Sequence, residues 1–153
     1  KAKDMLTMAI NQLLLQESKV QIAEQLTDFS HVNQVLSVHF DTKSKKVVKY
    51  QTREFDSSTT LMTLLLETYL HGQQQALLLN AAIGEKYSTA LLKNKPFEQD
   101  DLDKLWQDPN AMMSLADDPY MNYFWPSPPS LDVIKEQLEA IYLPLFSKVD
   151  KLK

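Results

Sequence analysis

Apolar residues recur at helical spacing near the beginning of the chain and again near its end. The segment 4–29 contains neither glycine nor proline, and its leucine and isoleucine residues follow one slowly rotating helix face. Near the end, Ser130 stands at an N-cap position before apolar residues spaced three or four apart: Leu131, Ile134, Leu138, Ile141, Leu145 and Val149. This pattern predicts a long first helix and an amphipathic closing helix. We expect a kink near Pro144, because its ring leaves the Ala140 carbonyl without its usual donor.

Between about residues 34 and 53 the spacing of apolar residues changes from a helical period to an alternation. Ser37 and His39 alternate with apolar neighbours, and a second alternating run follows a stretch rich in lysine. That stretch has no Asn-Gly or Asp-Gly pair, so the loop is expected to exceed two residues. The pattern predicts an antiparallel β-hairpin at about 34–53. An isolated hairpin is marginally stable in water, so either its edge pairs elsewhere or its apolar face contacts helices. That face contains Leu36, Val38, Phe40, Val48 and Tyr50.

The middle of the chain predicts a buried helical block. Apolar residues fall on almost every side of 61–70, which is typical of a helix that is buried all round. Gly72 and Gly84 are expected to end or break helices, and Pro96 to stop the block. Shorter helices are expected at 97–106, where the acidic start suits the positive end of the helix dipole, and at 111–116.

Composition places these elements in one α+β, mainly helical, globular domain over residues 1–153. The chain is 44% apolar and 24% charged, which is ordinary for a globular protein. Its formal net charge of −4 disfavours a general nucleic-acid binder. The most apolar stretch, 61–83, carries Glu67, His71 and three glutamines, so membrane association would need spans outside this sequence. The absence of cysteine does not decide the compartment; the cytoplasm is slightly favoured over an extracytoplasmic location.

Glycine and cysteine usage excludes several kinds of site. The chain has only two glycines, neither in a phosphate-binding loop motif, and no cysteine. Phosphate-cradling loops need backbone without a Cβ, and thiolate chemistry needs cysteine. No cofactor is therefore expected.

Glu67 and His71 stand four residues apart, which places both side chains on one helix face. Such a pair could bind a divalent metal or act as base and acid, but a metal needs a third ligand, and the sequence joins no second histidine in a metal motif. We predict that the pair is structural.

The predicted hairpin is basic, against the acidic balance of the whole chain. Its lysines are Lys43, Lys45, Lys46 and Lys49. They are candidates for contact with an anion, an anionic lipid or an acidic partner. The alternative is a solvated strand edge, because lysine also protects exposed edges from pairing with other chains.

Four aromatic residues precede a proline cluster at 126–129. They are Tyr120, Tyr123, Phe124 and Trp125, in what the prolines suggest is irregular backbone. Tyrosine and tryptophan are enriched in binding hot spots, so this segment is the candidate surface for a partner or ligand. The alternative is a loop that covers the core at the start of the closing helix.

These patterns favour a non-enzymatic interaction or regulatory domain that binds a protein partner, while leaving room for a small-molecule ligand. The first alternative is an extracytoplasmic ligand-sensing domain of a membrane receptor. The second is a metal-dependent hydrolase that uses Glu67 and His71.

Overall fold

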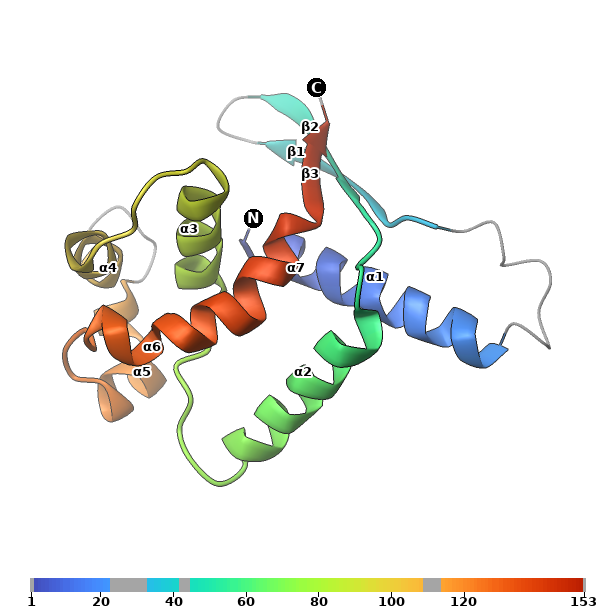
Figure 1. The fold of residues 1–153 in the computed structure, drawn as a ribbon. Helices are drawn as coiled ribbons and strands as arrows, with labels where there is room; N and C mark the ends of the chain where they lie inside the picture. Colours follow the sequence, from blue (N-terminus) through green and yellow to red (C-terminus); the bar gives the residue numbers. More distant parts are fainter. Residues whose placement is uncertain (1, 23–32, 42–44, 109–113, 153) are drawn as a thin grey trace.

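The computed structural model describes residues 2–22, 33–41, 45–108 and 114–152 (Figure 1). For residues 20–22 it describes the backbone alone. It confirms the α+β, mainly helical class. The described elements, in chain order, are α1 (Ala2–Ile22), β1 (Leu36–Asp41), β2 (Lys46–Thr52), α2 (Ser58–Gly72), α3 (Ala81–Leu92), α4 (Gln99–Trp106), α5 (Pro119–Phe124), α6 (Leu131–Gln137), α7 (Leu143–Ser147) and β3 (Val149–Leu152). A 3₁₀ turn at Leu115–Asp117 precedes α5, and a π-helical segment at Leu138–Tyr142 joins α6 to α7. The rest of the predicted helix at 111–116 lies outside the described residues.

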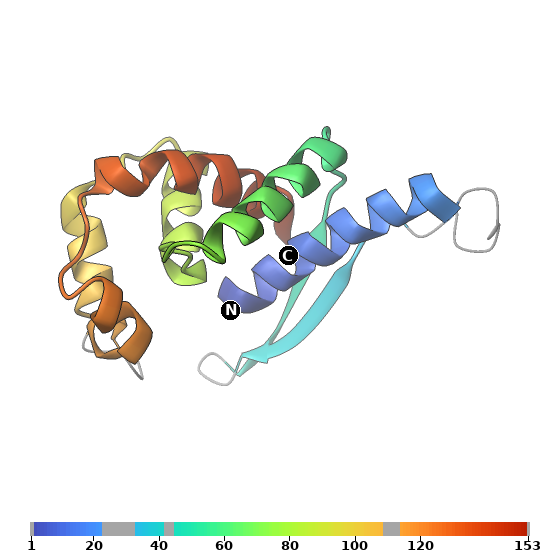
Figure 2. The ribbon, with the colours of Figure 1, turned by 90° about the horizontal axis from the view of Figure 1, so that it is seen from below.

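The core lies where α1, α3 and the closing helix meet. Helix α1 contacts α2, α3, α7 and strands β2 and β3, and α3 contacts the π-helical segment and α7. The closing helix runs from α4 and α5 at one end of the molecule to the sheet at the other (Figure 1). Figure 2 shows α1 alongside the hairpin. The most deeply buried side chains of the core are Leu13, Ile83, Leu102, Trp106, Leu138 and Leu145.

Two glutamines on one face of α1 fasten the helix to strand β2 and to the chain that follows it. Buried Gln12 accepts a hydrogen bond from the Thr52 hydroxyl at 2.7 Å, and that hydroxyl oxygen accepts one from the Val35 N–H at 2.8 Å. Gln16 accepts from the Phe55 N–H at 2.7 Å and donates to the Phe55 carbonyl at 3.1 Å. Because buried polar groups are costly when left without partners, these bonds fix how α1 sits against the sheet.

The hairpin forms as predicted, but one strand presents the opposite face to the core. β1 pairs antiparallel with β2, and Val48 and Tyr50 on β2 are half-buried and buried as expected. The prediction that Leu36, Val38 and Phe40 share one face with Val48 and Tyr50 is wrong, because these three side chains lie on the other face of the hairpin and are 56% to 63% exposed. The register explains the correction: it places polar Ser37 opposite Tyr50, so β1 directs its alternate, polar side chains toward α1.

A third strand completes the sheet. The predicted closing helix ends at Ser147, and the chain continues as β3, which pairs antiparallel with β2. Val149 is still buried, but as a strand residue opposite Thr52 rather than as part of the helix stripe. The Arg53 side chain donates to Asp150 at 2.6 Å and to the Ser147 carbonyl at 2.6 Å, which ties β2 to the end of α7. The hairpin edge thus pairs elsewhere, the alternative that the sequence analysis left open.

The stripe on the closing helix is buried as predicted, and the irregularity near Pro144 takes the form of a π-helical turn. The Leu143 N–H donates to the carbonyl of Leu138, five residues back. Pro144 follows at the start of α7 and has no N–H to contribute. The helix therefore changes its hydrogen-bond spacing just before the proline.

The two glycines play different roles. Helix α2 ends at Gly72 as predicted. Gly84 was expected to break a helix and does not, because it lies buried within α3. A Cβ on Gly84 would lie 2.3 Å from the Cγ and Cδ1 atoms of Tyr142. The missing side chain is therefore what lets α3 approach the π-helical segment.

Helix α2 is not buried all round, which corrects another prediction. Leu61 is its buried residue, whereas Leu66, Tyr69 and Leu70 are more than half exposed. The reason is that α2 contacts α1 and the π-helical segment along one side, which leaves the other side in solvent.

Candidate functional site

The aromatic segment is a short helix rather than irregular backbone. Asp118 caps it, because one of its carboxylate oxygens accepts hydrogen bonds from Tyr120 N–H at 2.9 Å and Met121 N–H at 3.1 Å. Pro119 occupies the first turn, where its fixed φ suits a helix and its missing N–H is not needed. The Asp-Pro pair was the sequence signal for this helix. Because the segment is helical, its aromatic side chains are held at fixed spacing.

The aromatic rings of this segment contact one another and form the aromatic cluster: Tyr120, Tyr123, Phe124 and Trp125. The ring centroid of Phe124 lies 4.9 Å from that of Tyr120, 4.8 Å from that of Tyr123 and 5.8 Å from that of Trp125. These separations are in the range of favourable tilted and edge-to-face contacts. Each ring therefore limits the freedom of its neighbours.

The cluster has a buried side and an exposed side. Met121 is buried in the core, and Trp125 is half-buried against the core. Tyr120 and Phe124 are exposed, and Tyr123 is 81% exposed. Trp125 therefore covers part of the core, whereas Tyr120, Tyr123 and Phe124 present their rings to solvent.

A hydrogen-bonding glutamine holds the chain that follows the cluster. Gln99, on the first turn of α4, donates to the Pro129 carbonyl at 3.1 Å and accepts from the Leu131 N–H at 2.7 Å. The same amide also donates to Asp103 at 2.9 Å. Ser130 stands at the N-cap of α6 but its side chain makes no capping bond, so Gln99 supplies the cap. The proline segment is thus attached to α4, and no periodic pattern in the sequence signals this attachment.

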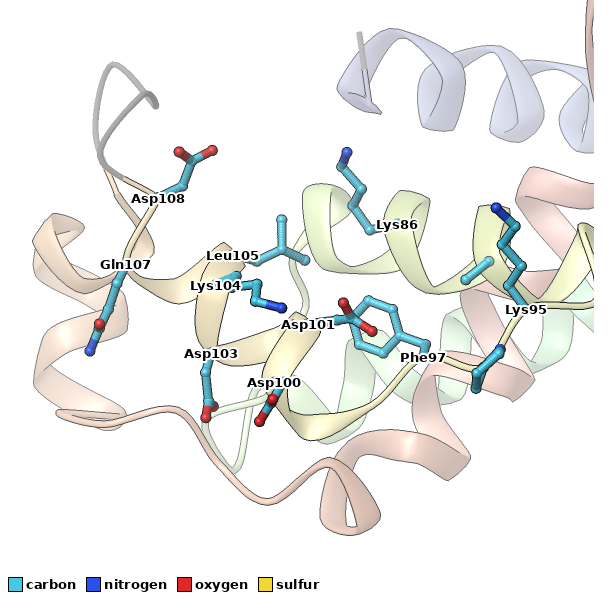
Figure 3. Close-up of a pocket in the computed structure, with 12 residues that line it drawn as sticks. Lys86, Lys95, Phe97, Asp100, Asp101, Asp103, Lys104, Leu105, Gln107 and Asp108 are labelled. Atoms are coloured by element: carbon cyan, nitrogen blue, oxygen red, sulfur yellow. The ribbon is translucent and has the colours of Figure 1, made fainter.

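A wide hollow of about 850 Å³ lies between α3 and α4 (Figure 3). Its lining mixes charges of both signs with the Phe97 ring: Lys86, Lys95, Lys104, Asp100, Asp101 and Asp103. Figure 3 shows Lys86 and Lys95 pointing away from Asp100 and Asp103. Within the described part of the chain, no group of three or more histidines and carboxylates could hold a metal ion. The hollow offers no geometry for a specific reaction.

The Glu67 and His71 side chains both lie on the solvent side of α2, where they are exposed. The described residues bring no third metal ligand to them. Of the basic residues that are candidates for anion contact, Lys45, Lys46 and Lys49 are exposed on the hairpin, and Lys43 lies outside the described residues.

Tyr87 and Glu139 form a hydrogen-bonded pair between α3 and the π-helical segment, with the phenol donating to the carboxylate at 2.7 Å. Burial, followed by the hydrogen bond to Glu139, raises the pKa of Tyr87 to about 12. Burial alone also raises the pKa of Tyr142. The Tyr87 phenol is protonated at neutral pH and serves as the donor that joins α3 to Glu139.

The chain matches no family model, no curated protein and no solved structure. Among the described residues, no helix is both long enough and apolar enough to cross a membrane.

Proposed function

We propose that this protein is a non-enzymatic interaction or regulatory domain that binds a protein partner through the aromatic cluster. One observation carries the proposal: three large rings, those of Tyr120, Tyr123 and Phe124, are exposed on a helix, and Phe124 contacts both tyrosines. Exposed aromatic groups of this kind are typical of binding hot spots, where they bury large apolar area at small cost in conformational entropy.

The most exposed ring, Tyr123, contributes little to the fold. Met121 and Trp125 already hold α5 against the core. Tyr123 points into solvent and contacts the neighbouring Phe124 ring, at 4.8 Å between centroids. A side chain with this much exposure gains little on folding, so its aromatic surface is available for a partner.

The hydrogen bonds around α5 support a prearranged surface. The Asp118 cap fixes the first turn, and Gln99 fixes the chain after the prolines. A partner that binds here meets rings whose backbone is already ordered, which reduces the entropy cost of association.

No specific observation favours the two alternatives. The ligand-sensing proposal rests on an arrangement of helices alone. The hydrolase proposal needs further groups beside Glu67 and His71, and the described residues supply none that would complete a metal site.

The test is a photo-crosslinker placed at position 123 in the cells that make this protein, with capture of the crosslinked partner and its identification by mass spectrometry. The matched control is the same crosslinker at position 133, because Val133 is also strongly exposed but lies on α6. We expect one partner to crosslink from position 123 and not from position 133.

The variant Tyr123→Ala then tests affinity for that partner. We expect a loss of about tenfold or more, with an unchanged melting temperature, while Val133→Ala keeps full affinity. The proposal fails if position 123 captures nothing beyond the control, or if Tyr123→Ala binds the captured protein as wild type does.

A further inference from the structure

The sheet has an outer face that is separate from the aromatic cluster and is largely apolar. The inner face, with Tyr50, Thr52 and Val149, lies against α1. The antiparallel registers place the alternate residues on the opposite side. We define the outer face as Leu36, Val38, Phe40, Val47, Lys49, Gln51, Asp150 and Leu152.

The apolar members of the outer face form a continuous patch. Phe40 is paired with Val47 across the hairpin, and Val38 is paired with Lys49. Leu36, Val38, Phe40 and Val47 are each more than half exposed. Contiguous apolar side chains on a sheet are a recognised sign of an interaction surface.

The dimensions of the outer face suit one helix. Six residues of β1 extend roughly 20 Å, and the outer strands of a three-stranded sheet lie roughly 10 Å apart. An α-helix is about 10 Å across and covers 20 Å in about 13 residues. A helix on this face would complete a three-layer arrangement with α1 on the other side.

The charge of the face indicates an acidic occupant. Lys49 stands in the middle of it, next to Val38 on β1 and Leu152 on β3, and has no ion pair among the residues that the structure describes. The acidic residue of the face, Asp150, is already paired with Arg53 at 2.6 Å. Lys45 and Lys46 are exposed at the hairpin end. This region is basic although the whole chain has a net charge of −4.

A second copy of this chain and a lipid surface fit the face less well. Two such sheets stacked face to face would each bury a Lys49, and the carboxylate that the other copy brings, Asp150, is already paired with Arg53 of its own chain. A bilayer would take up Phe40 and Val38 but would draw central Lys49 away from the headgroups. An acidic side chain beside the apolar stripe of a helix pairs with Lys49 directly.

We propose that the outer face of the sheet binds an amphipathic helix of a protein partner, with aspartate or glutamate beside its apolar stripe. The apolar stripe lies over Leu36, Val38 and Phe40, and the carboxylate lies against Lys49. This site is independent of the aromatic cluster.

The probe is a synthetic peptide of about 20 residues with leucines at helical spacing and glutamates on both flanks of the stripe. Its twin carries lysine in place of each glutamate. Fluorescence anisotropy measures the affinity of both peptides at low and moderate salt. We expect the acidic peptide to bind at least about tenfold more tightly than its twin, and more weakly as salt rises.

Two variants locate the binding. Val38→Ser with Phe40→Ser should weaken binding of the acidic peptide about tenfold or more, and Lys49→Glu should reverse the preference between the peptides. The matched control is Leu66→Ser, since Leu66 is an exposed leucine on α2. Circular dichroism melting checks that each variant is folded. If the double variant unfolds, Lys49→Glu alone still tests the proposal. Tyr123→Ala should bind the peptide as wild type does, because Tyr123 lies in the aromatic cluster and not on the outer face.

Several results would overturn the proposal. They are failure of the acidic peptide to bind at about 1 mM, equal affinity for the twin, or unchanged affinity after both outer-face changes. Sedimentation with vesicles rich in phosphatidylserine tests the lipid alternative, and light scattering tests self-association. Binding to vesicles, or a dimer, that is lost in Val38→Ser with Phe40→Ser would assign the face to that occupant instead.

Discussion

The closing helix and strand β1 have equally regular apolar patterns but opposite environments. Ile134, Leu138 and Ile141 repeat at helical spacing and are at most 5% exposed. Leu36, Val38 and Phe40 repeat at strand spacing and remain in solvent. Periodicity tells which residues share a face. Whether that face is covered depends on elements that come from elsewhere in the chain.

The difference follows from what each stripe can contact. The π-helical segment and α7 of the closing helix contact α3, and α7 also contacts α1, so the apolar side of this part of the helix is covered. Strand β1 is at the edge of the sheet, and α1 fastens itself to β2 through Gln12 and Thr52. That attachment selects the inner face of the sheet and leaves the apolar side of β1 outside.

Truncating the buried stripe should have the largest effect. We expect Leu138→Ala to lower the free energy of unfolding by about 2–5 kcal/mol, through lost transfer energy and a residual cavity. Urea denaturation measures this loss, with exposed Val133→Ala as the control, expected within about 0.5 kcal/mol of wild type. A loss under about 1 kcal/mol for Leu138→Ala would mean that the stripe is not core.

The close approach of α3 should give a smaller but clear effect. A methyl group at Gly84 meets the Tyr142 ring, which is buried and stacked on Phe146 at 6.1 Å between centroids. We expect Gly84→Ala to cost about 1–3 kcal/mol in spite of alanine's better helix propensity. Gly72→Ala is the matched control, because its Cβ would meet Leu77 at an ordinary 3.4 Å. Equal stability of the two variants would contradict the tight contact.

The smallest effect should come from the outer face of the sheet. We expect Val38→Ala to change the free energy of unfolding by no more than about 0.5 kcal/mol, because the side chain is already in solvent. Parallel urea curves for Val38→Ala and Leu138→Ala measure the contrast directly. A cost above about 1 kcal/mol for Val38→Ala would mean that β1 is covered in the folded protein and would remove the contrast.

Local signals in the sequence were enough for the hairpin, for the α4 helix and for the buried stripe of the closing helix. They failed where the outcome depends on distant residues. From the sequence alone Gly84 is expected to break a helix, but in the structure it leaves room for the Tyr142 ring, which comes from a distant part of the chain. Strand β3 is four residues long, and its first residue, Val149, continues the apolar spacing of the closing helix. Only the pairing with β2 identifies this segment as a strand.

The candidate site was predictable in its residues but not in its form. The density of aromatic residues identified the cluster. The helix at Pro119–Phe124 was not predicted, because the prolines at 126–129 favour irregular backbone, whereas the helix start signal is only the pair Asp118 and Pro119. The division between Trp125 and the exposed Tyr123 depends on packing against the core, which no local pattern contains. Gln99 reaches its partners across about 30 residues of sequence and gave no signal.

The pairing of β3 with β2 has a consequence for synthesis. Arg53 and Asp150, which join the two strands, are 97 positions apart. At roughly 5–20 residues per second, a ribosome needs about 5–20 s to make the intervening chain. Throughout that interval any hairpin formed by β1 and β2 would have an open edge on β2 and apolar side chains on its outer face. The sheet is therefore completed late, and its β1–β2 part must stay free of other chains until the last strand emerges.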